Sequence, residues 1–184
     1  MKKLNNITAG LVCLALSAGV MAQGVTDDEV VLGTSTALSG PAALWGVAAS
    51  QAAQIRFDMA NESGGVHGRQ IRVVLEDHQY QVPIHVKAMN KLMNLDKVFA
   101  TFNVLGTPMN LATAETQFAN NVPMLFPMTT AKSVQEPEHD LKLTFGSSYY
   151  NQIRFAVGHF LATGRTSACV MYQDTAYGTE VLEA

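Results

Sequence analysis

Cysteine is scarce in this chain of 184 residues, where only Cys13 and Cys169 carry a thiol. Cys13 lies in the apolar N-terminal run and lacks the Leu-x-Gly that precedes a lipoprotein cysteine, so we expect it to be removed with that segment. The count excludes a disulfide framework. Cys169 falls in a predicted strand, where a buried small hydrophobic residue is a better interpretation than a nucleophile.

Charge is sparse as well, since charged residues make up only 15% of the chain. The formal net charge is −3, and loss of Lys2 and Lys3 with the N-terminus leaves 10 basic against 15 acidic residues. No basic stripe is present, which excludes nucleic acid as an expected partner. The 48% hydrophobic content is typical of a globular protein.

Long apolar runs are absent after the N-terminus, so no later stretch is expected to cross a membrane. The N-terminus itself has the pattern of a secretory signal. Met1-Lys2-Lys3 supplies positive charge, residues 7–20 are apolar, and Val20-Met21-Ala22 offers a small-residue cleavage site. We therefore predict a signal peptide over residues 1–22, rather than a transmembrane anchor, with cleavage after Ala22.

The motifs of common enzymes are also absent. The sequence has no Gly-x-Ser-x-Gly nucleophile elbow, no phosphate-binding loop and no Gly-x-Gly-x-x-Gly fingerprint. Its histidines are dispersed and complete no metal-ligand set. Glu76-Asp77-His78 ends a predicted strand, but helix capping or solvent contact explains it better than acid–base chemistry. We predict no catalytic residue, no metal and no cofactor.

Strand and helix patterns alternate along the chain. Short apolar runs predict strands at Val30–Gly33, Ile71–Leu75, Val98–Phe102, Val122–Phe126, Leu141–Phe145 and Ser167–Tyr172. Helical spacing predicts helices at Pro41–Glu62, Pro83–Met93, Met109–Asn120 and Tyr149–Ala162. The expected fold is α/β, with three layers and a mostly parallel sheet covered by helices on both faces.

The first predicted helix follows the turn Ser39-Gly40-Pro41 and ends at Gly64-Gly65. Its apolar residues at helical spacing, expected on one face, are Ala48, Ala52, Ile55 and Met59.

Right-handed crossovers place the loops that follow the strands at one edge of the sheet, where open α/β sheets bind ligands. Hydroxyls, glycines and aromatic residues gather in these loops, and they suit the binding of a small polar molecule: Ser39, Trp45, Gly106, Thr107, Thr129, Thr130 and Tyr177. Thr107 is also a candidate N-cap of the helix that follows. Trp45 is either a stacking wall or part of the core.

Three segments resemble a known family in order and spacing: Leu38–Gly46, Asn61–Gly68 and Asp174–Gly178. They are similar to the first loop, the Asn-x-x-Gly-Gly-Ile-x-Gly signature and the Asp-x-x-Tyr-Gly motif of type I periplasmic solute-binding proteins of the leucine/isoleucine/valine-binding family. The resemblance implies a periplasmic, non-catalytic receptor whose two lobes close over a ligand. An ABC permease in the inner membrane then collects the ligand.

The resemblance also implies roles for residues. Loops at Gly106-Thr107 and Met128-Thr129-Thr130 would hold a carboxylate, and the cleft aromatics fall on Trp45 and Tyr177. The implied ligand is a branched-chain amino acid or a similar small amino acid, carboxylate or amide. The family's serine-rich run is replaced here by Leu105–Asn110, and its frequent disulfide is absent, so the ligand identity stays open.

The chain is shorter than members of this family, and only the first hinge crossing, near Gly146, is expected. We predict residues 23–146 as the N-terminal lobe and residues 147–184 as the incomplete start of a second lobe, in an N-terminal fragment of a monomer. A ligand-sensing domain of a receptor or of an amide-responsive regulator, with the same fold, is the alternative function.

Overall fold

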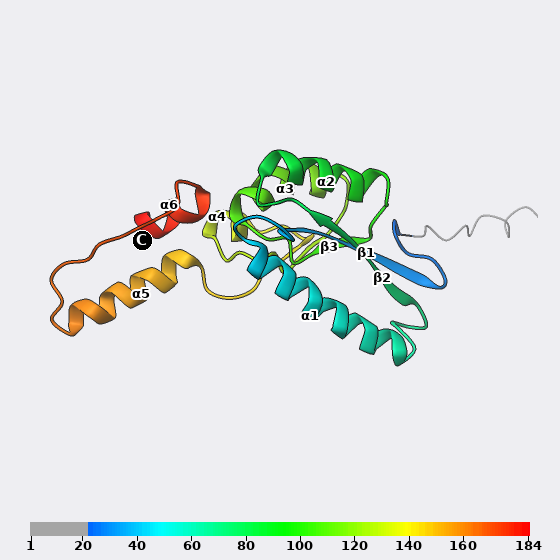
Figure 1. Cartoon of the computed structure of the whole chain (residues 1–184), viewed down its shortest axis with the longest axis horizontal. Helices are drawn as coiled ribbons and strands as arrows, with labels where there is room; N and C mark the ends of the chain where they lie inside the picture. The colour runs from blue at the N-terminus through cyan, green and yellow to red at the C-terminus, as the bar shows by residue number, and fades with distance from the viewer. Residues whose placement is uncertain (1–21) are drawn as a thin grey trace, which may run out of the picture.

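The computed structural model describes residues 22–184, which form an α/β fold around a five-stranded sheet (Figure 1). The strands lie in the order β2-β1-β3-β4-β5, and every neighbouring pair is parallel. They are β1 (Glu29–Thr36), β2 (Gln70–Asp77), β3 (Ala100–Phe102), β4 (Met124–Leu125) and β5 (Lys142–Leu143). The helices are α1 (Ala43–Glu62), α2 (Val82–Asn94), α3 (Thr107–Ala119), α4 (Lys132–Gln135), α5 (Tyr149–Ala162) and α6 (Ala176–Glu183). The predicted fold class is confirmed.

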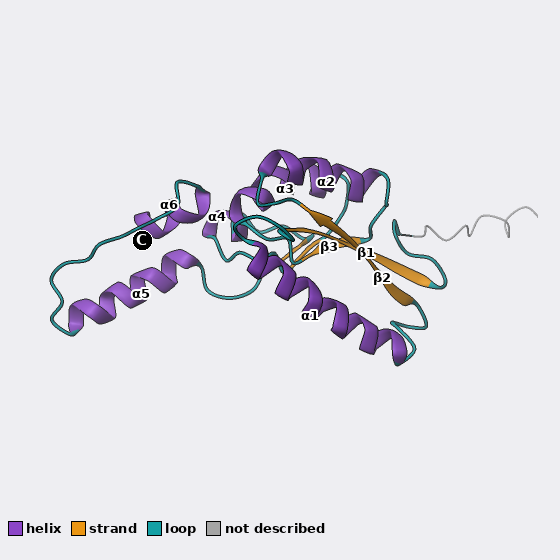
Figure 2. Cartoon of the chain, in the orientation of Figure 1, coloured by secondary structure: helices purple, strands orange, loops and turns teal. Residues whose placement is uncertain are grey.

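Helices cover both faces of the sheet, with α1 on one side and α2 and α3 on the other (Figure 2). The side chains of β1 alternate between these layers, because successive residues of a strand point to opposite faces. A Cβ at Gly33 would meet Leu92 of α2, and a Cβ at Gly46 of α1 would meet Thr36. The main apolar core lies on the α2 side and consists of Val31, Met89, Leu92, Met93, Val98 and Val122.

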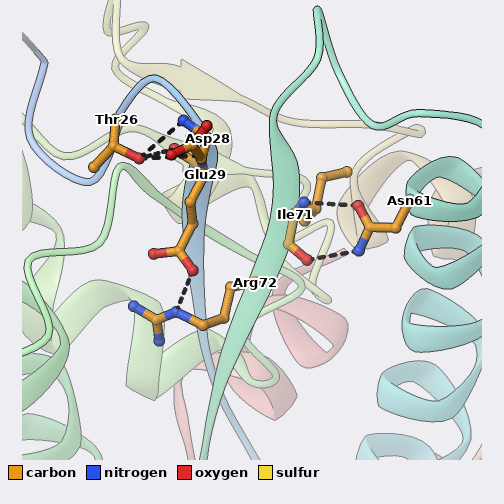
Figure 3. Close-up of polar contacts among 6 residues, drawn as sticks. All are labelled: Thr26, Asp28, Glu29, Asn61, Ile71 and Arg72. Atoms are coloured by element: carbon orange, nitrogen blue, oxygen red, sulfur yellow. Dashed lines mark hydrogen bonds and ion pairs between the residues drawn. The ribbon is translucent and has the colours of Figure 1, made fainter.

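The end of α1 is fastened to the edge strand β2 by the amide of Asn61 (Figure 3). Its Nδ2 donates to the carbonyl of Ile71 at 2.9 Å, and its Oδ1 accepts from the N–H of Ile71 at 2.7 Å. One side chain thereby satisfies both backbone groups of an edge residue, as a neighbouring strand would. On the other border of β2, Arg72 pairs with Glu29 of β1 at 2.9 Å.

The helix prediction for α1 is right in extent but wrong in its apolar face. Ala48 and Ala52 are exposed, and Ile55 and Met59 keep 63% and 54% of their surface exposed. The helix meets the sheet through another side, where Gly46 is its only fully buried residue. The spacing of apolar residues defines a stripe on α1. The side of α1 that faces the sheet is instead the side on which Gly46 lets the helix approach the end of β1 closely.

The strand predicted at Ser167–Tyr172 does not form, and Cys169 is exposed rather than buried. Residues 165–173 form a loop that does not pair with the five strands of the described sheet. An apolar β-branched sequence becomes a strand only where a neighbouring strand accepts its hydrogen bonds, and none of the described strands lies beside this one. The other strands form where the sequence predicts them, with β3, β4 and β5 shorter than expected.

The predicted signal peptide, residues 1–22, lies outside the described residues apart from Ala22. Among the helices of residues 22–184, none is long and apolar enough to cross a membrane.

Candidate functional site

The loops that follow β1, β3 and β4 lie at one edge of the sheet and border a cleft of about 640 Å³. Because β1 lies between β2 and β3, the connections leaving β1 and β3 diverge, and open α/β sheets keep a crevice at such a point. Seven of the eight predicted ligand-binding residues line this cleft: Trp45, Gly106, Thr107, Met128, Thr129, Thr130 and Tyr177.

Ser39 is the predicted residue that the structure places elsewhere. Its hydroxyl donates to Oδ2 of Asp77 at 2.6 Å, while Oδ1 of Asp77 accepts from the N–H groups of Leu38 and Gln79. Burial alone would raise the pKa of Asp77, but these hydrogen bonds outweigh it and hold the carboxyl pKa below its ordinary value. Ser39 therefore fastens the first loop to the end of β2 and does not line the cleft.

A pair of buried threonines forms the polar floor of the cleft. The hydroxyls of Thr107 and Thr129 lie 2.7 Å apart, and Oγ1 of Thr129 also accepts from the N–H of Ala131. Two hydroxyls that share one hydrogen bond keep one further O–H proton to donate. The predicted N-cap role of Thr107 is wrong, since Gly106 occupies that position and Thr107 is already helical.

Backbone N–H groups add to this floor. Those of Thr107, in the first turn of α3, and of Thr130 have no hydrogen-bond partner among the described residues. The start of a helix favours negative charge, because its free N–H groups and its macrodipole are both positive there. Within the described residues, no charged side chain lines the cleft. The arrangement suits a carboxylate or another small anion.

Tyr80 lines the cleft although the sequence did not indicate it. It follows β2, the one early strand whose loop contributed no candidate. Gln79 and Tyr80 both have positive φ angles, 54° and 58°, which cost energy for residues with side chains. A Cβ at Gly106 (φ 105°) would lie 3.1 Å from Cε2 of Tyr80. The ring of Tyr80 therefore lies against a position where only glycine leaves room.

Two buried histidines support the cleft from behind. Nδ1 of His78 accepts from the N–H of Tyr80 at 2.9 Å, so Nε2 carries the proton and donates to the carbonyl of Leu105 at 3.1 Å. His85 contacts the hydroxyls of Ser35 and Thr113 at 3.0 and 3.1 Å. Burial lowers the pKa of His78, and it lowers the pKa of His85 to about 3. His78 thus joins the loop residues Tyr80 and Leu105, and His85 joins β1 to α3 behind them.

Aromatic residues form the walls of the cleft. Tyr149 at the start of α5 and Tyr177 of α6 pack edge to face, with ring centroids 5.1 Å apart. Tyr80 lines the same cleft, and burial together with the nearby phenols of Tyr149 and Tyr177 raises its pKa. Trp45 stands at the mouth with 67% of its surface exposed, so it is not part of the core.

Several lining residues had no separate signal in the sequence. Beyond Tyr80 and Tyr149, these are Phe145, Gln152 and Gln173. Nε2 of Gln152 donates to Oγ1 of Thr130 at 3.3 Å. All three lie in or after the segment near Gly146, where the strand-and-helix alternation no longer predicted which residues return to the sheet edge.

The carboxylate of Glu180 ties α6 to the sheet edge. Its Oε2 accepts from the N–H of Lys132 at 2.8 Å, and its Oε1 accepts from the N–H of Tyr150 at 3.0 Å. Both donors lie at the starts of helices, where a negative charge is favourable. This contact holds Tyr177, three residues earlier on α6, beside the cleft.

A larger hollow of about 950 Å³ lies outside the loops of the sheet edge, between α4 and α6. It contains none of the predicted residues and none of the free N–H groups at strand ends, so the 640 Å³ cleft is the better candidate for a binding site. Among residues 22–184, no group of three or more histidine, cysteine, aspartate or glutamate side chains is placed to hold a metal ion.

Comparisons with known proteins agree with this architecture. The family described as "Periplasmic binding protein" matches residues 29–184. No curated protein matches the chain. Among solved structures, a fatty acid ABC transporter substrate-binding protein from Thermomonospora curvata is 26% identical with a TM-score of 0.79. The alignment covers 88% of this chain and 41% of that one.

Two further structures extend the comparison. A substrate-binding periplasmic protein from Ralstonia solanacearum is 27% identical, with a TM-score of 0.79 and coverage of 84% of this chain and 44% of that chain. A branched-chain amino acid ABC transporter protein from Thermus thermophilus, solved with bound valine, is 20% identical with a TM-score of 0.75. There the match covers 86% of this chain and 42% of that one. The chain thus spans less than half the length of these structures.

Proposed function

We propose that this chain, which belongs to the periplasmic binding protein family, is part of a solute receptor that holds a small carboxylate-bearing ligand and passes it to an ABC permease. The observation that carries the proposal is the cleft lining at Thr107, Thr129 and Thr130. These residues bring two buried hydroxyls and two N–H groups without a partner among the described residues, and no charged side chain of the described residues lines the cleft. The receptor binds its ligand and does not transform it.

We assign a role to each part of the cleft. The ligand carboxylate accepts hydrogen bonds from the hydroxyl proton left over by the Thr107–Thr129 pair and from the N–H groups of Thr107 and Thr130. The start of α3 adds a favourable electrostatic field. Met128 and the rings of Trp45 and Tyr177 enclose the body of the ligand. These are contacts for holding a molecule, and they offer no nucleophile.

We assign residues 23–146 to the first lobe of such a receptor and residues 147–184 to the beginning of the second. Residues 1–22 act as a cleaved secretory signal, so the receptor works in the periplasm and meets its permease at the inner membrane. We take the receptor to be a monomer. The names of the similar structures support an amino acid or another small carboxylate as the ligand class. The remaining ligand contacts come from parts of a complete receptor that correspond to the uncovered length of those structures.

Thr129→Val tests the proposal, because it removes the shared hydroxyl and keeps the side-chain shape. Calorimetric titration of the full-length protein with amino acids and simple carboxylates should show binding that Thr129→Val weakens about 10- to 100-fold, the range of a charge-assisted hydrogen bond. Thr116→Val is the matched control, since Thr116 is exposed on α3 away from the cleft. A folded protein that binds none of these compounds, or equal affinities for both variants, contradicts the proposal.

A further inference from the structure

One titratable ring joins the loops that follow β2 and β3. His78 is the first residue after β2 and is fully buried. Its Nδ1 accepts from the N–H of Tyr80 at 2.9 Å, and its Nε2 donates to the carbonyl of Leu105 at 3.1 Å. Tyr80 and Leu105 both line the cleft, and Leu105 precedes Gly106, the N-cap of α3. The position of one loop relative to the other therefore depends on the two nitrogens of a single imidazole.

The backbone on the Tyr80 side of this link is strained. Gln79 and Tyr80 have φ angles of 54° and 58°, in the left-handed region that residues with side chains rarely adopt. Nδ1 of His78 is the only acceptor that the described residues offer to the N–H of Tyr80, since the N–H of Gln79 donates to Oδ1 of Asp77. A hydrogen bond to a titratable nitrogen thus helps to hold a conformation that the chain would otherwise avoid.

A proton on Nδ1 of His78 would break one half of the link. The protonated nitrogen no longer accepts, so two N–H donors would face each other across 2.9 Å. Nε2 would still donate to Leu105. The ring of Tyr80 lies against Gly106, because a Cβ there would be 3.1 Å from Cε2 of Tyr80. A shift of Tyr80 would therefore change the shape of the cleft at the start of α3.

Three ionisable groups surround His78. Asp77 precedes it on β2, Tyr80 lies in the loop with its ring centroid 6.3 Å away, and His85 of α2 lies at 5.5 Å. The loop before α3 has no ionisable residue, and Glu115, the only one in α3, is exposed. Burial lowers the pKa of His78, and the charge of Asp77 offsets this only in part. The ring is therefore neutral at neutral pH and gains a proton only in acid.

We infer that His78 is a positioning residue, which keeps Tyr80 and Leu105 in place for ligand binding only while its ring is neutral. This inference rests on the proposed function, because it takes the cleft as the ligand site. His78 does not line the cleft and acts through Tyr80, which does. Protonation of His78 and ligand binding then oppose each other. The affinity is constant above the pKa of the ring and falls below it, by up to about tenfold for each pH unit.

NMR of the full-length protein tests the link without a ligand. The ring nitrogens of His78 should show the Nε2–H tautomer at neutral pH. As the ring gains its proton in acid, the backbone N–H signals of Tyr80 and Gly106 should change with the same midpoint. His159→Gln is the control, because His159 is exposed on α5 and its loss should leave this titration unchanged. Backbone signals that do not follow His78, or a ring that stays neutral until the protein unfolds, overturn the inference.

Calorimetric titrations at several pH values test the consequence for binding. The probes are valine and hexanoate, an amino acid and a simple carboxylate. The affinity of the probe that binds should fall below the His78 midpoint found by NMR. His78→Asn offers an acceptor to the backbone two residues on but does not titrate, so it should keep the affinity at neutral pH within about threefold and lose the pH dependence. An equal pH dependence in His78→Asn and the unaltered protein overturns the inference.

His78→Gln separates positioning from stability. The longer side chain brings its amide near the place of Nε2 and leaves the N–H of Tyr80 without its acceptor, so the affinity should fall about tenfold in the folded protein. His85→Gln is the matched control, since His85 is equally buried but contacts Ser35 and Thr113. Lower stability with unchanged affinity in His78→Gln shows a merely structural role and overturns the inference. If neither probe binds to the unaltered protein, the proposed function fails, whereas the NMR titration alone decides whether His78 positions Tyr80.

Discussion

The helices α1 and α2 cover opposite faces of β1 but are held there by different contacts. In α2, five of 13 residues are buried, among them Met89, Leu92 and Met93 of the main core. In α1, which has 20 residues, only Gly46 is fully buried. A Cβ at Gly46 would lie 2.0 Å from the carbonyl oxygen of Ala37, so backbone approaches backbone at this point.

The difference separates two ways to position a binding loop. On the α2 side, buried apolar area stabilises the sheet. There His78 hydrogen-bonds to the loop residue Leu105, and His85 joins β1 to α3 through Ser35 and Thr113. On the α1 side, the close approach at Gly46, the two hydrogen bonds of Asn61 and the edge-to-face contact of Phe57 with Phe102 fix the helix that carries Trp45. On the α2 side, we expect substitutions that remove buried side-chain volume to destabilise the protein. On the α1 side, we expect the destabilising substitutions to be those that add side-chain volume at the close approach.

The largest expected effect is loss of volume on the α2 side. Leu92→Ala removes a fully buried side chain from the main core and should lower the free energy of unfolding by about 3 kcal/mol. Ile55→Ala on α1 is the matched control, because Ile55 is 63% exposed, and it should change stability by less than about 0.5 kcal/mol. Urea denaturation measures both. Equal losses in the two variants would contradict the contrast between the helices.

A smaller effect is expected for gain of volume on the α1 side. Gly46→Ala forces α1 away from Ala37 and should lower the free energy of unfolding by about 2 kcal/mol. Gly158→Ala in α5 is the control. A Cβ at Gly158 meets nothing within 4 Å, so alanine should stabilise this helix by roughly 0.5–1 kcal/mol. Thermal unfolding that shows stabilisation in both variants would refute the close-contact argument.

The same contrast shows what the sequence made predictable. Periodicity located the strands and helices, and strand-end positions identified Gly106, Thr107, Thr129 and Thr130 as neighbours in one cleft. These inferences succeed because they depend on local pattern and on the handedness of crossovers, which are general. The outward apolar stripe of α1 was assigned to the wrong side because a close backbone approach at Gly46 leaves no periodic signal.

The parts of the cleft that were missed depend on long-range contacts. Tyr80 faces the site because of a left-handed backbone held by His78, and no local pattern distinguishes that tyrosine from a solvated loop residue. Ser39 is predicted as a ligand contact, but its hydroxyl donates to the carboxylate of Asp77, 38 positions away. The paired hydroxyls of Thr107 and Thr129 also required the fold to be known.

The smallest expected effect is a pH dependence on the α2 side. The pKa of His85 is lowered to about 3 by burial and by the neighbouring His78, against 6.5 for an ordinary histidine. Above pH 6.5 the ring is neutral in both the folded and unfolded states. Below it, the unfolded chain takes up a proton that the buried ring does not, so stability falls as the pH falls from 6.5 toward 3.

Between pH 6.5 and 5.5 this linkage should lower the free energy of unfolding by about 1 kcal/mol. His85→Gln keeps groups that hydrogen-bond to Ser35 and Thr113 but does not titrate, so its urea denaturation should show a drop smaller by that amount. His159→Gln, a change of an exposed histidine on α5, should keep the full drop. An equal drop in His85→Gln and the unaltered protein would show that His85 is not buried behind the cleft as a neutral ring, and that the α2 side does not hold the site in this way.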